Sequence, residues 1–285
     1  MGATDARRGW TVREVLAWTT SRFARADLPT ARLDAELLLA RAVGRSRLDL
    51  YTDPDRPVVE AERAAFRALI DRRLAGEPVA YLLGRREFWS LEVSVDSRVL
   101  VPRPETETLV EEALDRVREV AAPRVVDVGT GSGAVALALR KERPDARLLA
   151  IDVSRGAIDI AAANSRALNL PLELLRADLL SAIAPGADLD LVVSNPPYLR
   201  PDEIVGALER EPRLALDGGP DGLRVTMRLI EQAAERLRPA GALAIEIAPQ
   251  SADRLVDLLQ TSGWRDARRR RDLSTAFRVV SARRP

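Results

Sequence analysis

The sequence predicts an α/β protein with two domains joined by a β-hairpin. Three observations carry this prediction. Apolar residues recur at helical spacing up to about residue 83, short alternating runs follow, and strand-like and helix-like segments alternate after Pro123. We therefore expect a helical bundle over residues 1–83, a hairpin linker over 84–102 and an α/β domain over 103–285. The alternation in the last part predicts a mostly parallel sheet covered by helices.

Three amphipathic helices are expected in the first 83 residues. The first follows Thr11, which can cap it, and the third covers residues 60–75. The second begins at Thr30, where apolar residues recur at i, i+4 and i+7: Leu33, Leu37 and Ala40. These helices carry no chemically distinctive residues, so they are interpreted as a packed bundle, with a protein-recognition module as the alternative.

Alternating apolar runs at residues 87–89 and 91–95 predict the hairpin. In the α/β part, short apolar runs predict strands at residues 125–128, 148–151, 172–175, 191–193 and 242–247. Helices are expected at residues 134–139, from Ser154 onward, at 227–237 and at 252–259. The sequence shows no internal repeat and no low-complexity tract.

The composition excludes several classes of chemistry. The chain has 285 residues, of which 46% are hydrophobic, and it contains no cysteine, no histidine and a single lysine, Lys141. Disulfides, thiol nucleophiles, Cys/His metal sites and Ser-His-Asp triads are therefore excluded, and we expect no metal site. With 44 basic and 43 acidic residues the net charge is +1, so direct nucleic-acid binding is not expected.

Neither a membrane span nor a secretion signal is expected. No stretch approaches the roughly 18 consecutive apolar residues of a membrane-spanning helix, and residues 1–10 lack the apolar core of a signal peptide. We therefore expect a cytoplasmic protein without membrane association.

A glycine-rich turn follows the first predicted strand of the α/β domain. It consists of Gly129, Thr130, Gly131, Ser132 and Gly133. Glycines let backbone N–H groups approach a ligand closely, and Asp152 lies about 20 residues downstream, where an acidic residue can bind ribose hydroxyls. An adenosine-like ligand is expected here, and the turn alone leaves NAD and S-adenosylmethionine as alternatives.

The fourth predicted strand is followed by a second motif, Asn195, Pro196, Pro197 and Tyr198. Ligands of open α/β sheets bind beyond the carboxyl ends of strands, so this motif should face the same crevice as the glycine turn. Prolines donate no backbone hydrogen bond and Asn195 adds a carbonyl oxygen, so the motif offers acceptors for both hydrogens of a planar –NH2 group. Tyr198 offers an aromatic wall for a flat amide or base. The pairing favours methyl transfer to an amino group.

Together the two motifs resemble those of the amino-methyltransferases that use S-adenosylmethionine. Four further segments narrow the resemblance to the peptide chain release factor N5-glutamine methyltransferases, the HemK/PrmC family: residues 34–40, 78–84, 101–107 and 211–216. Three sites depart from the family pattern, because glycine is usual where this chain has Ser90, Ala248 and the pair Ser274 and Thr275. These departures concern loop geometry and leave both central motifs intact.

The resemblance implies a Rossmann-like, seven-stranded methyltransferase domain and a defined reaction. S-adenosylmethionine would methylate the side-chain amide nitrogen of the glutamine in the Gly-Gly-Gln motif of class 1 peptide chain release factors. Residues 129–133 would hold the methionine part of the cofactor, Asp152 its ribose, and Asp178 and Leu179 its adenine.

The resemblance also assigns the segment Asn195, Pro196, Pro197 and Tyr198 to catalysis and substrate binding. Asn195, which also borders the cofactor, and the Pro196 carbonyl would each accept one amide hydrogen, and Tyr198 would pack on the glutamine. We expect a monomer.

Two alternatives keep this fold and change the substrate to a ribosomal-protein glutamine or to adenine N6 in DNA. A third, an NAD-dependent oxidoreductase, leaves residues 195–198 unexplained. Arg103, Glu105 and Glu107 fit two interpretations equally, as cleft-lining residues or as a salt-bridge set at the domain junction. The arginine run 268–271 is interpreted as a solvated surface turn, with contact to an acidic or RNA-bearing partner as the alternative.

Overall fold

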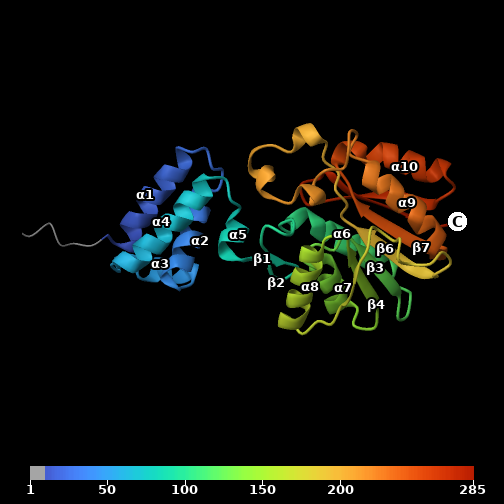
Figure 1. The fold of residues 1–285 in the computed structure, drawn as a ribbon, viewed down its shortest axis with the longest axis horizontal. Coiled ribbons are helices and arrows are strands. Elements are labelled where there is room, and N and C mark those ends of the chain that lie inside the picture. The colour runs from blue at the N-terminus through green and yellow to red at the C-terminus, as the bar shows by residue number, and fades with distance from the viewer. Residues whose placement is uncertain (1–9) are drawn as a thin grey trace, which may run out of the picture. The chain divides into compact units, whose positions relative to one another are not determined.

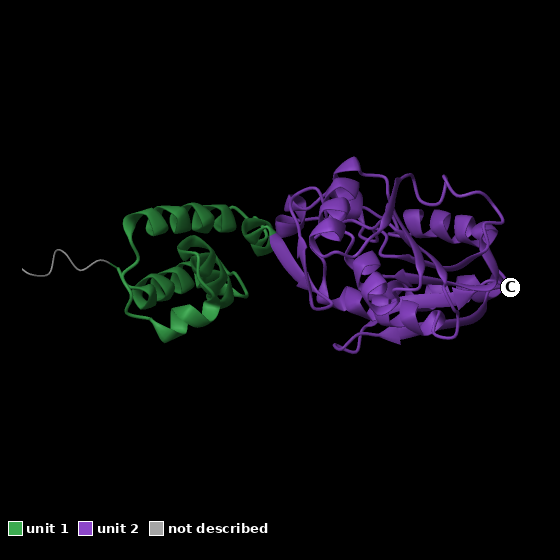
Figure 2. Cartoon of the chain, turned by 90° about the horizontal axis from the view of Figure 1, so that it is seen from below, with its two compact units in different colours: residues 1–84 green, residues 85–285 purple. Residues whose placement is uncertain are grey.

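The computed structural model describes residues 10–285, which form two compact units, one ending at Gly84 and the other beginning at Arg85 (Figure 2). Residues 1–9 lie outside the described residues. They make up most of the N-terminal segment in which no signal peptide is expected. Every helix within residues 10–285 is too short or too polar to cross a lipid bilayer.

The described part of the first unit is helical (Figure 1). Its helices are α1 (Val12–Ala24), α2 (Ala31–Val43), α3 (Arg47–Thr52), α4 (Glu60–Leu74) and α5 (Val79–Leu83). The three predicted helices correspond to α1, α2 and α4, and α3 and α5 are additional short helices. Thr11 caps α1 as predicted, because its hydroxyl accepts from Glu14 N at 3.3 Å and its N–H donates to the Glu14 carboxylate at 2.8 Å.

The predicted apolar stripe of α2 is partly wrong. Leu33 is 40% exposed, whereas Asp34 and Glu36 are buried. Helix α2 contacts α1, α3, α4 and α5, so it is covered on several sides and buries polar side chains as well. Asp34 is paired with Arg73 at 2.8 Å and Glu36 with Arg47 at 2.7 Å, and these ion pairs compensate the burial of both carboxylates.

The second unit contains a hairpin, β1 (Arg85–Phe88) and β2 (Leu91–Ser94), and a seven-stranded sheet. The strands of the sheet are β3 (Arg124–Val128), β4 (Arg147–Asp152), β5 (Glu173–Arg176), β6 (Leu189–Ser194), β7 (Leu237–Glu246), β8 (Arg265–Arg271) and β9 (Phe277–Arg283). Their spatial order is β5-β4-β3-β6-β7-β9-β8. The first five are parallel, and β9 is antiparallel to both β7 and β8. The predicted Rossmann-like, seven-stranded α/β fold is thus confirmed.

Helices cover both faces of the sheet (Figure 1). They are α6 (Glu107–Arg116), α7 (Ala134–Glu142), α8 (Arg155–Ala167), α9 (Arg224–Arg236) and α10 (Ala252–Thr261). Side chains of α6 and α7 share one apolar core with the sheet, and those of α9 and α10 share a second. Short 3-10 helices occupy Pro104–Thr106, Pro201–Glu203, Gly206–Arg210, Arg213–Ala215 and Pro249–Ser251.

The interpretation of residues 268–271 as a surface turn is wrong, because these arginines belong to strand β8. The strand lies at the edge of the sheet, where a row of charged side chains is tolerated. Arg268 pairs with Glu112 of α6 at 2.9 Å, and Arg270 pairs with Asp115 at 2.6 Å. The arginines therefore attach the edge strand to a neighbouring helix.

The β1–β2 hairpin closes through Trp89 and Ser90, which both have a φ of +52°. A two-residue turn with two positive φ values is the type I′ geometry, which favours glycine or asparagine. The Trp89 N–H donates to the Glu107 carboxylate at 2.8 Å, and its indole N–H donates to Glu142 at 2.9 Å. Ser90, one of the departures from the family pattern, therefore adopts a left-handed conformation that glycine adopts without strain.

Replacing Ser90 with glycine should stabilise the second unit. Relief of the left-handed strain is worth about 1 kcal/mol, less the entropy that glycine loses on folding. We expect Ser90→Gly to raise the temperature of the unfolding transition measured by circular dichroism. Ser90→Ala, which keeps the strain, is the control. Equal transitions for the two variants would show that the turn geometry contributes nothing to stability.

Candidate active site

Two neighbouring parallel strands bring the predicted motifs together. Strands β3 and β6 pair in parallel, with Val128 opposite Ser194, so the residues that follow them leave the sheet at the same edge. The Ser194 hydroxyl is buried and donates to the Val128 carbonyl at 2.7 Å, which further fixes the two strand ends. A Cβ atom at Gly129 would lie 3.9 Å from the Asn195 carbonyl oxygen. The sheet alone therefore places the glycine turn beside the second motif.

The glycines of the turn differ in what they face. Gly129, Gly131 and Gly133 have φ values of +73°, +55° and +83°, all in the left-handed region. A Cβ atom at Gly131 would meet no atom within 4 Å, whereas one at Gly133 would lie 3.2 Å from the Ala161 Cβ. Gly131 thus leaves open space for a ligand, and Gly133 allows close packing between the start of α7 and helix α8.

Asp152 ends β4 and holds the turn in place. Its Oδ2 accepts from the Gly131 N–H at 3.0 Å, and its Oδ1 accepts from the Ser154 N–H at 2.8 Å. Burial raises the pKa of Asp152, while these backbone donors favour its charged form. A carboxylate oxygen can accept more than one hydrogen bond, so Asp152 can hold the loop and also receive hydroxyl donors from a ribose.

Asp127 is a buried carboxyl that lines the cavity, and the sequence motif that contains it gave it no role. Its side chain lies at the end of β3, and Oδ2 accepts from the Thr130 hydroxyl at 2.6 Å. Burial raises the pKa of Asp127 to about 7. The signal in the sequence was an aspartate within an apolar strand, separated from the glycine turn by Val128 alone.

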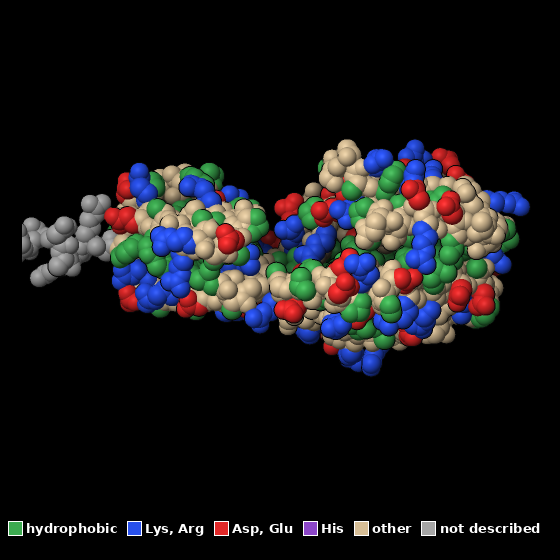
Figure 3. Space-filling view, turned by 90° about the horizontal axis from the view of Figure 1, so that it is seen from above, with side chains coloured by type: hydrophobic (Ala, Val, Ile, Leu, Met, Phe, Trp, Pro, Cys, Tyr) green, Lys and Arg blue, Asp and Glu red, His purple; other side chains and the backbone are tan. Residues whose placement is uncertain are grey.

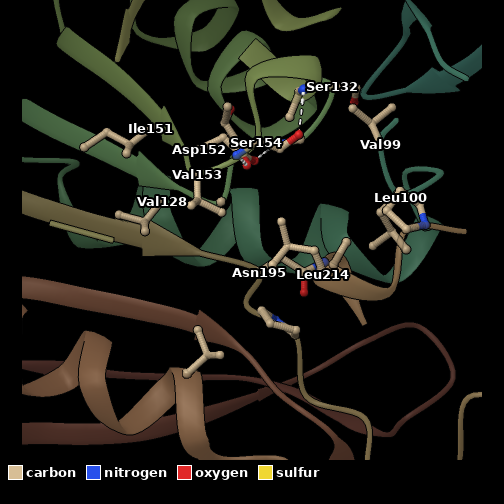
Figure 4. A pocket seen from close by; sticks show the side chains of 18 of the residues that line it. Val99, Leu100, Val128, Ser132, Ile151, Asp152, Val153, Ser154, Asn195 and Leu214 are labelled. Carbon is tan, nitrogen blue, oxygen red and sulfur yellow. Dashed lines mark hydrogen bonds between the residues drawn. The ribbon is translucent and has the colours of Figure 1, made fainter. Parts of the chain in front are cut away.

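These residues line a cavity of about 690 Å³ within the second unit (Figure 4). This volume lies in the range of roughly 300–1,000 Å³ typical of small-molecule sites. Figure 4 shows Asp152 and Ser154 on one side of the cavity, with Asn195 and Leu214 on the other. Nine of the predicted residues line it: Gly129, Thr130, Gly131, Ser132, Asp152, Asp178, Leu179, Asn195 and Pro197. Gly133, Pro196 and Tyr198 lie next to the lining residues along the chain.

The side chain of Asn195 presents its oxygen as an acceptor. Its Nδ2 donates to the Thr106 hydroxyl at 3.3 Å. The amide nitrogen therefore has a partner, and Oδ1 lies on the other side of the amide group. Thr106 is itself buried, in the 3-10 helix that precedes α6. Because Asn195 and Thr106 both line the cavity, the Oδ1 atom can accept a hydrogen bond from a ligand there.

Tyr198 is fixed by a buried partner. Its hydroxyl donates to the Glu246 Oε1 at 3.2 Å. Burial and the negative charge of Glu246 raise the pKa of the Tyr198 phenol, so it remains a neutral donor. Glu246 was not predicted as a site residue, because it lies 48 residues further along the chain.

A second glycine-rich segment clamps the backbone that follows the motif. A Cβ atom at Gly218 would lie 2.7 Å from the Pro197 carbonyl oxygen. A Cβ atom at Gly222 would collide with the Tyr198 carbonyl oxygen. The Leu199 N–H donates to the Leu216 carbonyl oxygen at 2.9 Å. The Leu199 carbonyl oxygen in turn accepts from the Gly218 N–H at 2.8 Å. The sequence signal for these positions was the glycine content of residues 217–222.

Arg103, Glu105 and Glu107, which the sequence left as either cleft-lining residues or a salt-bridge set, have different partners in the structure. Arg103 lines the cavity and forms an ion pair with Glu211, which also accepts from the Val101 N–H at 3.0 Å. Glu107 instead binds the hairpin through the Trp89 N–H. Glu105 lies close enough to Glu246 to raise the pKa of that carboxyl.

The chain matches known proteins in both units. Residues 14–84 match the family model described as the PrmC N-terminal domain, and residues 105–211 match the methyltransferase small domain. Among solved structures, the chain is similar in fold to a ribosomal protein L11 methylase from Lactobacillus delbrueckii subsp. bulgaricus. That similarity has a TM-score of 0.50 at 20% identity and covers 67% of this chain and 84% of the other.

Curated relatives cover almost the whole chain. It is 41% identical over 292 residues to the release factor glutamine methyltransferase of Rhodopirellula baltica, covering 99% of both chains. It is 43% identical over 276 residues to that of Burkholderia pseudomallei, covering 94% of this chain and 96% of the relative. These matches confirm the resemblance stated from the sequence motifs, and the chain belongs to the release factor glutamine methyltransferase family.

Proposed function

We propose that this chain transfers a methyl group from S-adenosylmethionine to a side-chain amide nitrogen of a class 1 peptide chain release factor. The target is N5 of the glutamine in the Gly-Gly-Gln motif. The observation that carries the proposal is the position of Asn195, whose Oδ1 is free to accept in the cavity that Gly129 and Gly131 also line. The names of the relatives favour this substrate over a ribosomal-protein glutamine or DNA adenine.

The residues at the glycine turn fit the cofactor. Gly131 leaves open space at the cavity, Asp152 offers carboxylate oxygens for ribose hydroxyls, and Asp178 and Leu179 line the cavity after β5. When bound there, S-adenosylmethionine supplies an electrophilic methyl group on a positively charged sulfur. The buried carboxyl of Asp127 also lines the cavity, and in its charged form it favours a cationic ligand.

The second motif orients the target nitrogen. An amide nitrogen is a poor nucleophile because its lone pair is delocalised into the carbonyl. Asn195 Oδ1 and the Pro196 carbonyl would accept its two hydrogens, which points the lone pair at the methyl group and stabilises positive charge on nitrogen. Tyr198 and Pro197 wall the site, and the proton lost after transfer leaves to solvent.

The proposal assigns separate tasks to the parts of the chain. Residues 1–83 recognise the protein substrate, residues 84–102 link the two domains, and residues 103–285 carry the chemistry. The enzyme acts as a cytoplasmic monomer, without direct contact to nucleic acid. The mixture of basic and acidic side chains on the face shown in Figure 3 supports a protein partner over a nucleic acid.

Truncating Asn195 should abolish most of the activity. Loss of one preorganised acceptor of developing charge costs on the order of 10²- to 10³-fold in turnover. We expect this loss for Asn195→Ala when methylation of a purified release factor is followed by mass spectrometry. Isothermal titration calorimetry with S-adenosylmethionine should show an affinity close to that of the wild type. Turnover near the wild-type value in a folded variant would contradict the role of Asn195.

Gly131 should be required for cofactor affinity. A Cβ atom there would occupy ligand space and force a strained φ, so we expect Gly131→Ala to weaken S-adenosylmethionine binding by about tenfold or more, which is about 1.4 kcal/mol. Gly186→Ala is the matched control. Its φ of +74° imposes similar strain and its Cβ position is also open, but Gly186 does not line the cavity. Equal affinities of the two variants would exclude the glycine turn as the cofactor site.

A further inference from the structure

Glu246 is a buried carboxyl that the proposed reaction does not yet use. It ends strand β7, which pairs with β6 through Ile245 opposite Ser194, so Glu246 lies beside the first residue of the Asn195 motif. Its side chain is 1% exposed. Oε1 accepts from the Tyr198 hydroxyl, whereas Oε2 has no well-formed hydrogen bond to any described residue. A buried and incompletely satisfied carboxyl is costly, so its position calls for an explanation.

Thr106 connects Glu246 to Asn195. The Thr106 hydroxyl lies close enough to Glu246 to lower the pKa of that carboxyl, and it accepts from Asn195 Nδ2 at 3.3 Å. A hydroxyl has one hydrogen to donate. If that hydrogen points to the carboxylate, the oxygen of Thr106 can only accept from Asn195, and the amide must turn its NH2 group toward Thr106. Asn195 Oδ1 then faces the cavity.

We propose that Glu246 is a positioning residue, which acts through Thr106 to hold the Asn195 amide with its oxygen toward the target nitrogen. The inference rests on the proposed function for the identity of that target. Without the carboxylate, the Thr106 hydroxyl is free to donate to Asn195 Oδ1. The amide can then rotate and present its NH2 group to the NH2 group of the target glutamine, where two donors repel each other.

The groups around Glu246 set its charge. Burial raises the pKa of Glu246 to about 7, Glu105 raises it further, and Thr106, Tyr198 and Arg278 oppose the increase. Because the pKa is raised, the carboxylate dominates above about pH 7 and the protonated acid dominates below it. The protonated acid can also donate its own hydrogen to the Thr106 oxygen, so the carboxyl no longer fixes the direction of that hydrogen bond. The orientation of Asn195 should therefore be lost as pH falls through about 7.

The side-chain amide of Asn195 can be observed directly, because the chain contains only three asparagines, Asn164, Asn169 and Asn195. In protein with 15N-labelled asparagine side chains, the NH2 signals of Asn195 should shift between about pH 6 and pH 8. Glu246→Gln should remove the inflection that Glu246 causes. Glu36→Gln, the same change at a buried glutamate of the first unit, should leave it unchanged. An inflection that persists in Glu246→Gln would assign the titration to another group, such as Asp127, and overturn the proposal.

Kinetics test the connection through Thr106. At about pH 8, Glu246→Gln should lower kcat by about 10- to 100-fold, as the loss of a supporting hydrogen-bond partner commonly does. The affinity for S-adenosylmethionine should stay the same. Thr106→Val should cost a similar factor, and the double variant should be little worse than either single variant, because both changes break one relay. Thr106→Ser, which keeps the hydroxyl, should retain most of the activity.

Each result distinguishes the inference from the proposed function. A wild-type enzyme that does not methylate a release factor would contradict the proposed function. The NH2 signals of Asn195 would still report the orientation of its amide group. An active wild type with an equally active Glu246→Gln variant, or additive effects of the two changes, would overturn the inference alone. Thermal unfolding at pH 8 serves as the folding control, and replacing a buried charge by a neutral amide should not lower stability there. If Glu246→Gln does not fold, the Thr106→Val and Thr106→Ser pair carries the test.

Discussion

The site depends on the adjacency of β3 and β6 in the middle of the sheet. From this pair, the chain adds β4 and β5 on one side and β7 on the other, so the loops after β3 and β6 leave the same edge with no strand between them. This reversal of strand order is the point at which open α/β sheets bind ligands. The sheet hydrogen bonds, and the Ser194 hydroxyl bonded to Val128, therefore place Asn195 beside the glycine turn without any contribution from loop packing.

Much of the fold could be predicted because its central strands are apolar and its turns are rich in glycine. The run around Val126 and the turn after it are local patterns, and both are confirmed. Strand β8 could not be found in this way, because its arginines are stabilised by acidic residues of α6 more than 150 positions away. The burial of Asp34 in α2 has the same origin, since Arg73 is its partner. Periodicity describes one face of one element and misses charges that distant residues neutralise.

The residues of the candidate site show the same difference between local sequence patterns and contacts with distant segments. The residues that we propose contact a ligand through local geometry, such as Gly131, Asp152 and Asn195, lie within short motifs that the sequence itself displays. Residues that support them come from other segments: Thr106 lies 89 positions before Asn195, and Glu246 lies 48 positions after Tyr198. Gly218 is in the site because its backbone passes against Pro197, a contact that only the fold creates. Supporting residues leave little trace in a motif because their roles depend on three-dimensional neighbours.

Stability alone does not account for the residue at position 246. Ile245 and Ile247 flank it and Val279 lies opposite it in the sheet, all apolar and almost fully buried, so a charge at this position carries a desolvation cost. Proteins break such local rules mainly where function requires it. A chain without histidine has few groups that change charge near neutral pH, and burial moves the pKa values of two carboxyls, Asp127 and Glu246, into that range. Neither needs to take a proton from the amide, because an amide held by two acceptors can react first and lose its proton afterwards. The buried carboxyls therefore set the charge and the hydrogen-bond direction of the site, and the reaction depends on alignment more than on acid–base catalysis.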